Sequence, residues 1–220
     1  MGKQIAIDGP AGAGKSTIAK IVSKKLGFIY VDTGAMYRSA ALFFLKKGVD
    51  LSDEKVCSGL VDEIDISLKY EDGAQKVILN DEDVTGQIRT EEVSNSASKT
   101  AVYPAVRAKL SALQKKIAEE NDVVMDGRDI GTVVLPNAFL KIYLTASVEC
   151  RAERRYKEML EKGEAPDLET IKEDIRDRDY RDMHRSEEPL KKADDAVEID
   201  SSDMTIDEVA DAILNEYKKR

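Results

Sequence analysis

Short apolar runs alternate with amphipathic segments along most of the chain. The first run, Gln4–Asp8, precedes a glycine-rich turn and an amphipathic segment over about 16–26 that predicts a helix. Further runs of strand length are Phe28–Asp32, Val123–Asp126, Phe139–Leu144 and Ala196–Ile199. Short apolar strands that are separated by helices are typical of a mostly parallel sheet with helices on both faces. The pattern therefore predicts an α/β fold.

The stretch Ile64–Arg89 breaks this rhythm. Apolar and polar residues alternate up to a turn signal at Glu71-Asp72-Gly73, and the apolar run Val77–Leu79 follows the turn. A third short run spans Asp83–Ile88. Alternation on both sides of a turn is typical of antiparallel strands. We predict a small antiparallel sheet that is inserted into the α/β body, with a surface hairpin of no functional importance as the alternative.

Composition narrows the class of protein. The chain has 220 residues, is 42% hydrophobic and carries a formal net charge of −9, so it is long enough for one globular domain with a substantial core. The acidic balance argues against a protein that coats nucleic acid or anionic membranes. Two distant cysteines and one histidine provide no zinc or disulfide pattern. With no apolar segment at the N-terminus that resembles a signal peptide, we expect a cytoplasmic protein.

The glycine-rich turn matches the GxxxxGK[ST] pattern of a phosphate loop. Glycines let backbone N–H groups approach phosphates closely, and the start of the next helix adds partial positive charge. Lys15 has the reach for the β- and γ-phosphates, and the Ser16 hydroxyl suits Mg²⁺. The expected ATP-binding residues are Gly9, Pro10, Ala11, Gly12, Ala13, Gly14, Lys15, Ser16 and Thr17.

A second charged segment follows the apolar run at 123–126. In phosphate-loop folds, a carboxylate at the end of such a strand commonly holds Mg²⁺ through water, which suggests Asp126. Arg128 and Asp129 come next, at the edge of the sheet where open α/β folds bind ligands. A solvent-facing turn at 126–129 is the alternative interpretation.

Arginine is unevenly distributed. Seven of the twelve arginines fall between residues 151 and 185. At their spacing, Arg151, Arg154 and Arg155 would line one helix face, and Arg178, Arg181 and Arg185 another. The guanidinium group suits phosphate and stays charged during a reaction. A solvated helix with internal ion pairs is the alternative, but the nearby phosphate loop favours the binding of anionic substrates.

The motifs then leave two classes of function open. A nucleotide-dependent switch with slow hydrolysis is disfavoured, because the chain lacks the N-K-x-D motif that reads guanine. A kinase for a small anionic acceptor fits the clustered arginines better, because donor and acceptor phosphates repel each other and need screening. Such an acceptor is a nucleoside monophosphate or another small metabolite.

Five motifs together resemble the cytidylate kinase family of bacteria over essentially the whole chain. They are IDGPAGAGKST at the phosphate loop, DTGAMYR at 32–38, EDVTGQIRTEEVSNSAS at 82–98, DGRDIGTVV at 126–134 and RDRDYRDMHR at 176–185. The resemblance implies a P-loop fold with a five-stranded parallel sheet, an inserted antiparallel region and a helical lid. It further implies one kinase domain: a core at about 1–33, 106–147 and 186–220, a monophosphate-binding region at about 34–105, and a lid at about 148–185.

The same resemblance implies roles for individual residues. The α-phosphate of the acceptor would contact Tyr37, Arg38, Arg128 and Arg185. Cytosine would contact Thr33, Arg107 and Asp129, and the ribose would contact Ser98, Arg178 and Asp182. Catalysis would depend on Lys15, Arg128 and Arg185 and on lid arginines among Arg151, Arg154 and Arg155.

Independent chemistry supports the base-reading set. A carboxylate such as Asp129 accepts from the N4 amino group of cytosine, whereas uracil presents a carbonyl oxygen there. We therefore expect phosphoryl transfer from MgATP to CMP or dCMP, with Mg²⁺ bound by Ser16 and, through water, by Asp126. The expected partners are these nucleotides alone, without nucleic acid or membrane, and the expected oligomeric state is a monomer.

Overall fold

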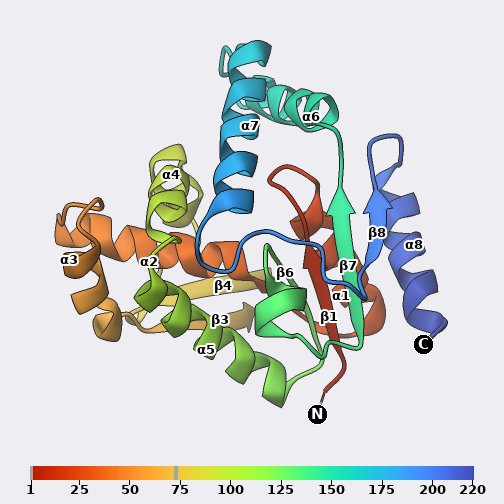
Figure 1. The fold of residues 1–220 in the computed structure, drawn as a ribbon, viewed down its shortest axis with the longest axis horizontal. Coiled ribbons are helices and arrows are strands. Elements are labelled where there is room, and N and C mark those ends of the chain that lie inside the picture. The colour runs from red at the N-terminus through yellow and green to blue at the C-terminus, as the bar shows by residue number, and fades with distance from the viewer. Residues whose placement is uncertain (1, 72–73) are drawn as a thin grey trace. The chain divides into compact units, whose positions relative to one another are not determined.

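The computed structural model describes residues 2–71 and 74–220. The chain forms two compact units (Figure 1). The first unit consists of Met1–Val31 and Asn121–Arg220, and the second consists of Asp32–Glu120. In the described part of the chain, no helix has both the length and the apolar character that crossing a membrane requires.

A five-stranded parallel sheet forms the centre of the first unit, in the order β2-β6-β1-β7-β8. The strands are β1 (Gln4–Asp8), β2 (Ile29–Asp32), β6 (Val123–Gly127), β7 (Leu140–Thr145) and β8 (Val197–Asp200). Each lies within one residue of the strand expected from the apolar runs. The predicted parallel sheet is therefore confirmed, and β1 at its centre pairs with β6 on one side and β7 on the other.

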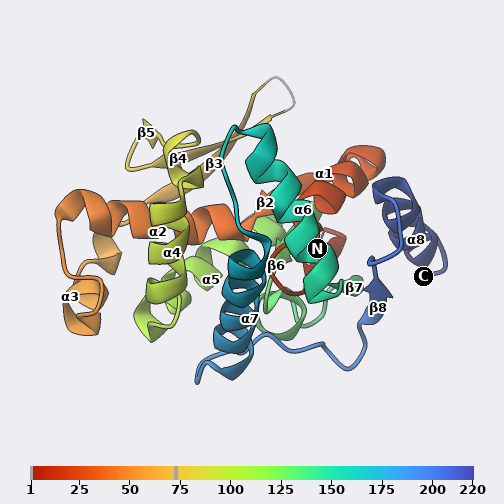
Figure 2. The same ribbon diagram turned by 90° about the horizontal axis from the view of Figure 1, so that it is seen from above.

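Helices α1 (Lys15–Leu26) and α8 (Ile206–Lys218) pack against this sheet. The same unit holds the short π-helical turn η3 (Ile130–Val134) and the helices α6 (Val148–Glu161) and α7 (Leu168–His184), which pack against each other. Ile5 and Ile142 of the sheet share one hydrophobic core with Val22 of α1 and Ile213 of α8. Helix α8 begins with a capping box, in which Thr205 and Glu208 bond each other's backbone N–H groups. Figures 1 and 2 show α6 and α7 side by side.

The second unit holds a separate antiparallel sheet in the order β3-β4-β5. Its elements are α2 (Thr33–Lys47), α3 (Glu54–Gly59), η1 (Val61–Glu63), β3 (Ile66–Glu71), β4 (Ala74–Leu79), β5 (Glu82–Asp83), η2 (Gln87–Arg89), α4 (Glu91–Thr100) and α5 (Pro104–Glu120). The predicted inserted sheet is thus confirmed (Figure 2). Part of the turn expected at 71–73, residues 72 and 73, lies outside the described residues.

The third strand of this sheet is shorter than expected. The sequence pattern predicted a strand over Asp83–Ile88, but β5 ends at Asp83. There the Asp83 carboxylate accepts the backbone N–H of Thr85 at 3.0 Å, an Asx turn that bends the chain away from the ladder. The 3₁₀ turn η2 follows, so the prediction was wrong beyond Asp83.

The helical arginine stripe also needs a correction. Spacing placed Arg178, Arg181 and Arg185 on one helix face, but α7 ends at His184, and Arg185 is extended with φ −63° and ψ 146°. The Arg185 guanidinium donates to the carbonyl oxygen of Glu188, three residues further along the chain. Periodicity alone did not reveal this end, although Pro189 follows closely and disfavours helical backbone in the residue before it.

Candidate functional site

A glycine-rich loop joins β1 to α1 in the first unit. Gly9 has a φ of 149°, and a Cβ there would collide with the carbonyl oxygen of Leu144 on β7. Gly14, the residue before α1, has a φ of 85°, in the left-handed region that favours glycine. Because glycine has no side chain, Gly14 does not cap the helix. The loop therefore combines backbone N–H groups with the positive end of a helix, both of which bind phosphate.

Lys15 lies at the start of α1 and is only 5% exposed. Its Nζ donates to the carbonyl oxygen of Pro10 at 2.7 Å. Burial, and then the positive charge of Arg128, lower the pKa of the Lys15 ammonium well below its ordinary value, although Asp126 and Asp182 oppose this change. A bound triphosphate supplies negative charge at this ammonium, so phosphate binding and protonation of Lys15 favour each other.

The structure places Ser16 beside Asp126. The Ser16 hydroxyl donates to Asp126 Oδ2 at 2.8 Å, and the Tyr30 hydroxyl donates to Asp126 Oδ1 at 2.9 Å. The parallel pairing of β1 with β6 sets Asp126 opposite Ile7, next to the phosphate loop. Sequence reasoning missed Tyr30, whose position in the strand run 28–32 gave no sign that its hydroxyl meets Asp126.

Charged side chains of opposite sign gather after β6. Arg128 Nε donates to Asp182 Oδ2 at 2.8 Å, and Arg185 Nη2 lies 3.7 Å from Asp129 Oδ1. Burial opposes ionisation of Arg128, but the carboxylates of Asp182, Asp126 and Asp179, Asp182 first, together outweigh it and raise the pKa of the guanidinium. Burial likewise raises the pKa of the Asp182 carboxyl, but Arg128, Arg178 and Arg185 together hold it below its ordinary value. Arg128 and Asp182 are therefore both charged at neutral pH.

Every guanidinium nitrogen of Arg151 on α6 donates a hydrogen bond. Its Nη1 and Nη2 donate to the two carboxylate oxygens of Asp179 on α7, at 3.1 and 2.7 Å. Its Nε donates to the carbonyl oxygen of Ala146, and Nη1 also donates to that of Ala11 in the phosphate loop. Arg151 therefore ties α7 to the phosphate loop. Asp179 was missed in the sequence, because helical spacing does not show which residues of two helices meet.

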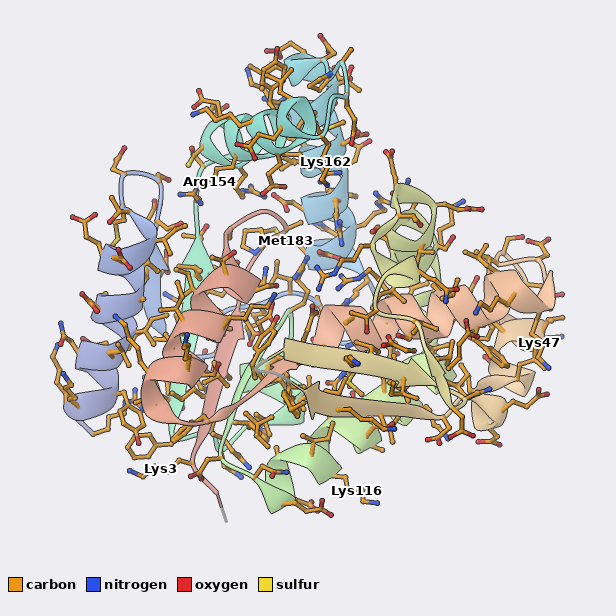
Figure 3. The ribbon with its side chains drawn as sticks, turned by 180° about the vertical axis from the view of Figure 1, so that it is seen from behind. Lys3, Lys47, Lys116, Arg154, Lys162 and Met183 are labelled. Carbon is orange, nitrogen blue, oxygen red and sulfur yellow. The ribbon has the colours of Figure 1, made fainter. Side chains whose placement is uncertain are left out.

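The other two lid arginines differ from Arg151. Arg154, labelled in Figure 3, donates from Nη2 to the carbonyl oxygen of Ser201 at 2.7 Å, in the loop between β8 and α8. Arg155 is half exposed and lies 3.7 Å from Glu158 of its own helix. The three arginines expected along one helix face thus have three different environments.

Two of the predicted nucleotide-binding residues lie at the start of α2 in the second unit. Thr33 is buried as the first residue of the helix. Arg38 Nη2 lies 3.2 Å from Asp32 Oδ2, and Asp32 also caps the helix by accepting the backbone N–H of Ala35. The Arg38 guanidinium is therefore held on the turn that carries Thr33.

A second pair of predicted residues joins α2 to α5. The guanidinium carbon of Arg107 lies 5.7 Å from the centre of the Tyr37 ring, and Arg107 Nη1 donates to the carbonyl oxygen of Ala101. Arg107 is only 3% exposed. Ser98 lies on α4, partly buried.

The predicted residues thus form two sets, one in each unit. The first unit brings together the phosphate loop, Asp126, Arg128, Asp129, Arg151, Arg178, Asp182 and Arg185. The second unit holds Thr33, Tyr37, Arg38, Ser98 and Arg107.

Sequence reasoning also missed Asp8, the last residue of β1. Its Oδ1 accepts the backbone N–H of Ile130 at 2.9 Å, and its Oδ2 accepts that of Gly131 at 2.7 Å. Burial is the largest influence and raises the pKa of the Asp8 carboxyl to about 6; Asp129 adds to this, while the two hydrogen bonds and Lys15 only partly oppose it. The available signal was a carboxylate at the end of an apolar run, the same signal that identified Asp126.

The raised pKa of Asp8 predicts a specific pH dependence of stability. Its folded value of about 6 lies above the ordinary 3.8, so the folded protein binds this proton more tightly than the unfolded chain. Ionisation of Asp8 therefore lowers the free energy of unfolding progressively as the pH rises from about 4 to 6, in total by about 3 kcal/mol for two pKa units. An asparagine does not ionise, so we expect the free energy of unfolding of Asp8→Asn to rise by about this amount relative to that of wild type as the pH increases from about 4 to 7.5.

Urea unfolding of both proteins at several pH values measures this gain. Other carboxylates titrate alike in both proteins and cancel in the difference. A difference between the two free energies of unfolding that stays constant with pH would contradict the prediction.

The parallel sheet, the phosphate loop and the Ser16–Asp126 pair define the class of P-loop kinases. A solved structure of the same fold is a shikimate kinase from Acinetobacter baumannii in complex with shikimate, with a TM-score of 0.50 and 15% identity over 100% of this chain and 94% of that one. At this identity the likeness concerns the fold alone.

Sequence comparison identifies the family. The cytidylate kinase family model matches residues 5–219. The chain is 54% identical over 218 residues to a cytidylate kinase of Bacillus licheniformis, covering 98% of this chain and 96% of that protein. It is 51% identical over 217 residues to a cytidylate kinase of Lactobacillus johnsonii, covering 99% and 94%. The chain belongs to the cytidylate kinase family.

Proposed function

We propose that this protein transfers the γ-phosphoryl group of MgATP to CMP or dCMP, which yields ADP and CDP or dCDP in pyrimidine nucleotide metabolism. The observation that carries the proposal is the placement of Arg128 and Asp129 directly after β6, beside the Asp126 that bonds the phosphate-loop Ser16. A cation for the acceptor phosphate and a carboxylate for its base thus stand next to the ATP site. Membership of the family supports the same activity.

The acceptor phosphate is assigned to four side chains. Arg128 and Arg185 belong to the first unit, and Tyr37 and Arg38 to the second. Each arginine is preorganised by a protein acceptor: Asp182 for Arg128, Asp32 for Arg38 and the carbonyl oxygen of Glu188 for Arg185. Held guanidinium groups neutralise the charge of two phosphates without reorganisation during transfer.

The base and the ribose are assigned to separate groups. Asp129 accepts from the cytosine N4 amino group, while Arg107 donates to the O2 and N3 acceptors and Thr33 supplies a hydroxyl. Uracil would leave Asp129 opposite a carbonyl oxygen, an unfavourable contact in a buried site. Ser98, Arg178 and Asp182 contact the ribose. The 3′-hydroxyl occurs in both sugars, so CMP and dCMP are both substrates.

The residues present fit Mg²⁺. Ser16 Oγ and the Asp126 carboxylate lie within 2.8 Å of each other, and hard oxygen donors with substrate phosphates and water are the usual environment of this ion. Asp126 would act through water. The ion neutralises phosphate charge when bound.

Transfer needs no general base, because the acceptor is already an anionic phosphate oxygen. Residues Gly9 to Thr17 bind the triphosphate, and Lys15 supports the β- and γ-phosphates. Arg128 and Arg185 hold the acceptor in line with the γ-phosphoryl group. The lid arginines Arg151, Arg154 and Arg155 complete the positive surroundings, and closure of the lid at about 148–185 excludes water.

In this proposal the chain is one kinase domain. Its core is at about 1–33, 106–147 and 186–220, and its monophosphate-binding region is at about 34–105. The cytoplasmic location and the monomeric state stay predictions from the sequence.

An acceptor panel tests the proposed function. ADP production from MgATP is measured with CMP, dCMP, UMP and AMP in turn, and without acceptor as the control. We expect fast turnover with CMP and dCMP, and kcat/KM lower by roughly 10²-fold or more with UMP. Turnover with UMP or AMP but not CMP would indicate another acceptor, and ADP production that is independent of any acceptor would indicate a hydrolysing switch.

A further inference from the structure

The Asp8 carboxylate connects two segments of the first unit. Its two oxygens accept separate backbone N–H groups, from Ile130 at 2.9 Å and from Gly131 at 2.7 Å. Asp8 is 5% exposed, and a buried N–H group without an acceptor is costly. The side chain at the end of β1 thus fixes the start of the π-helical turn η3.

This turn is not capped by its own N-terminal residue. Asp129 occupies the N-cap position, where an aspartate commonly accepts the next backbone N–H groups, but its side chain makes no such bond. Its carboxylate instead lies 3.7 Å from Arg185. Asp8 thus takes the capping role, and the Asp129 carboxylate is directed elsewhere.

Asp8 holds both ends of the Arg128–Asp129 segment. On one side, the parallel ladder between β1 and β6 pairs Asp8 with Gly127. On the other side, the Asp8 carboxylate holds Ile130 and Gly131. Only Arg128 and Asp129 lie between these fixed points, so their backbone has little freedom.

Close packing supports the same contact from the other side. A Cβ at Gly131 would lie 3.3 Å from Asp8 Oδ2 and 3.2 Å from Cδ of Lys141 on β7. Both distances are tighter than an ordinary side-chain contact. Lys141 Nζ donates to Asp195 at 2.8 Å, so the lysine stem is itself held in place. The absence of a side chain at Gly131 lets the Asp8 carboxylate reach the backbone.

We propose that Asp8 is a positioning residue of the kinase, whose carboxylate aims Arg128 and Asp129 at the monophosphate acceptor. The inference rests on the proposed function, because it takes those two residues as the acceptor contacts. Asp8 immediately precedes Gly9 of the phosphate loop, so one residue fixes the distance between the ATP site and the acceptor-binding segment.

Asp8→Asn tests this role while it preserves the shape of the side chain. An amide offers one acceptor oxygen, so one of the two N–H groups loses its partner and faces an NH₂ group instead. We expect kcat/KM for CMP to fall roughly 10- to 100-fold and the preference for CMP over UMP to shrink, since a charge-assisted hydrogen bond is lost. The dissociation constant of MgATP should stay within about twofold, because both hydrogen bonds of this carboxylate go to the η3 backbone and not to the phosphate loop.

Asp195→Asn is the matched control, because it removes a neighbouring carboxylate that bonds Lys141 but not the η3 backbone. It should retain wild-type kinetics. Gly131→Ala is the second variant. Its added methyl group pushes the Asp8 carboxylate from the other side and should lower kcat/KM for CMP in the same way. If Asp8→Asn does not fold, the kinetics of Gly131→Ala test the positioning role of Asp8.

Unchanged kcat/KM for CMP in Asp8→Asn would overturn the inference. Equal losses for CMP and MgATP would also overturn it, because they would indicate a general structural role. Wild-type protein without activity on CMP would instead reject the proposed function. In that event, faster backbone hydrogen exchange at 130–134 in Asp8→Asn would still support the anchoring by Asp8, and unchanged exchange would reject it.

Discussion

Arg128→Ala is expected to lower kcat with CMP by roughly 10²- to 10⁴-fold while the dissociation constant of MgATP stays close to that of wild type. Arg128 is partly buried, and its Nε is held by Asp182 at 2.8 Å. A guanidinium fixed in this way stabilises the phosphates of the ground state little more than water does. Its advantage arises when charge moves between two phosphates, where solvent would have to reorganise.

The ATP side should tolerate this change for an electrostatic reason. The positive charge of Arg128 is one of the causes that lower the pKa of Lys15, after burial. Removing it relieves Lys15 and favours its charged form, which binds the triphosphate. Loss of Arg128 therefore separates turnover from ATP binding.

Steady-state kinetics with CMP, together with direct titration of MgATP, measure the two effects separately. Arg176→Ala is a suitable control, because Arg176 belongs to the same arginine-rich stretch but is half exposed and lies 3.9 Å from Glu149. Arg176→Ala should behave as wild type. Wild-type turnover in Arg128→Ala would remove Arg128 from the acceptor site.

The sequence predicted the parts of the site that follow directly from strand ends. Asp126 and the phosphate-loop Ser16 were expected together, and they meet at 2.8 Å. The reason is topological: carboxyl ends of adjacent parallel strands lie at one edge of a sheet, so a charged residue after each apolar run marks that edge. Asp8 carried the same signal at the end of β1, but the phosphate-loop motif begins at the next residue and assigns no role to Asp8.

Contacts between helices were beyond the reach of the sequence pattern. Helical spacing grouped Arg151 with Arg154 and Arg155, but it does not show what each residue faces. Arg151 meets Asp179, which is 28 positions away on another helix. The early end of β5 at Asp83 was missed for a related reason, because an Asx turn is a local bond that competes with an extended pattern of only a few residues.

Asp179→Ala should lower the free energy of unfolding by about 3–5 kcal/mol, because it leaves the charge of Arg151 buried without its partner. The side chains of Arg151 and Asp179 are 4% and 13% exposed, and two parallel hydrogen bonds join them. Arg151→Leu alone should also destabilise the protein, since it leaves the carboxylate of Asp179 buried. Unfolding in urea measures both losses.

The double variant Arg151→Leu/Asp179→Leu distinguishes the contribution of the ion pair to stability from the contribution of Arg151 to the phosphate loop. Two apolar side chains of suitable size remove both buried charges, so the double variant should recover much of the stability that either single change loses. It also removes the donor to the carbonyl oxygen of Ala11 in the phosphate loop. We therefore expect weaker binding of MgATP even where stability returns, since the loop has lost one of its anchors. Stability losses that simply add in the double variant would show that Arg151 and Asp179 act independently. Unchanged binding of MgATP in the double variant would show that the phosphate loop does not rely on its bond from Arg151.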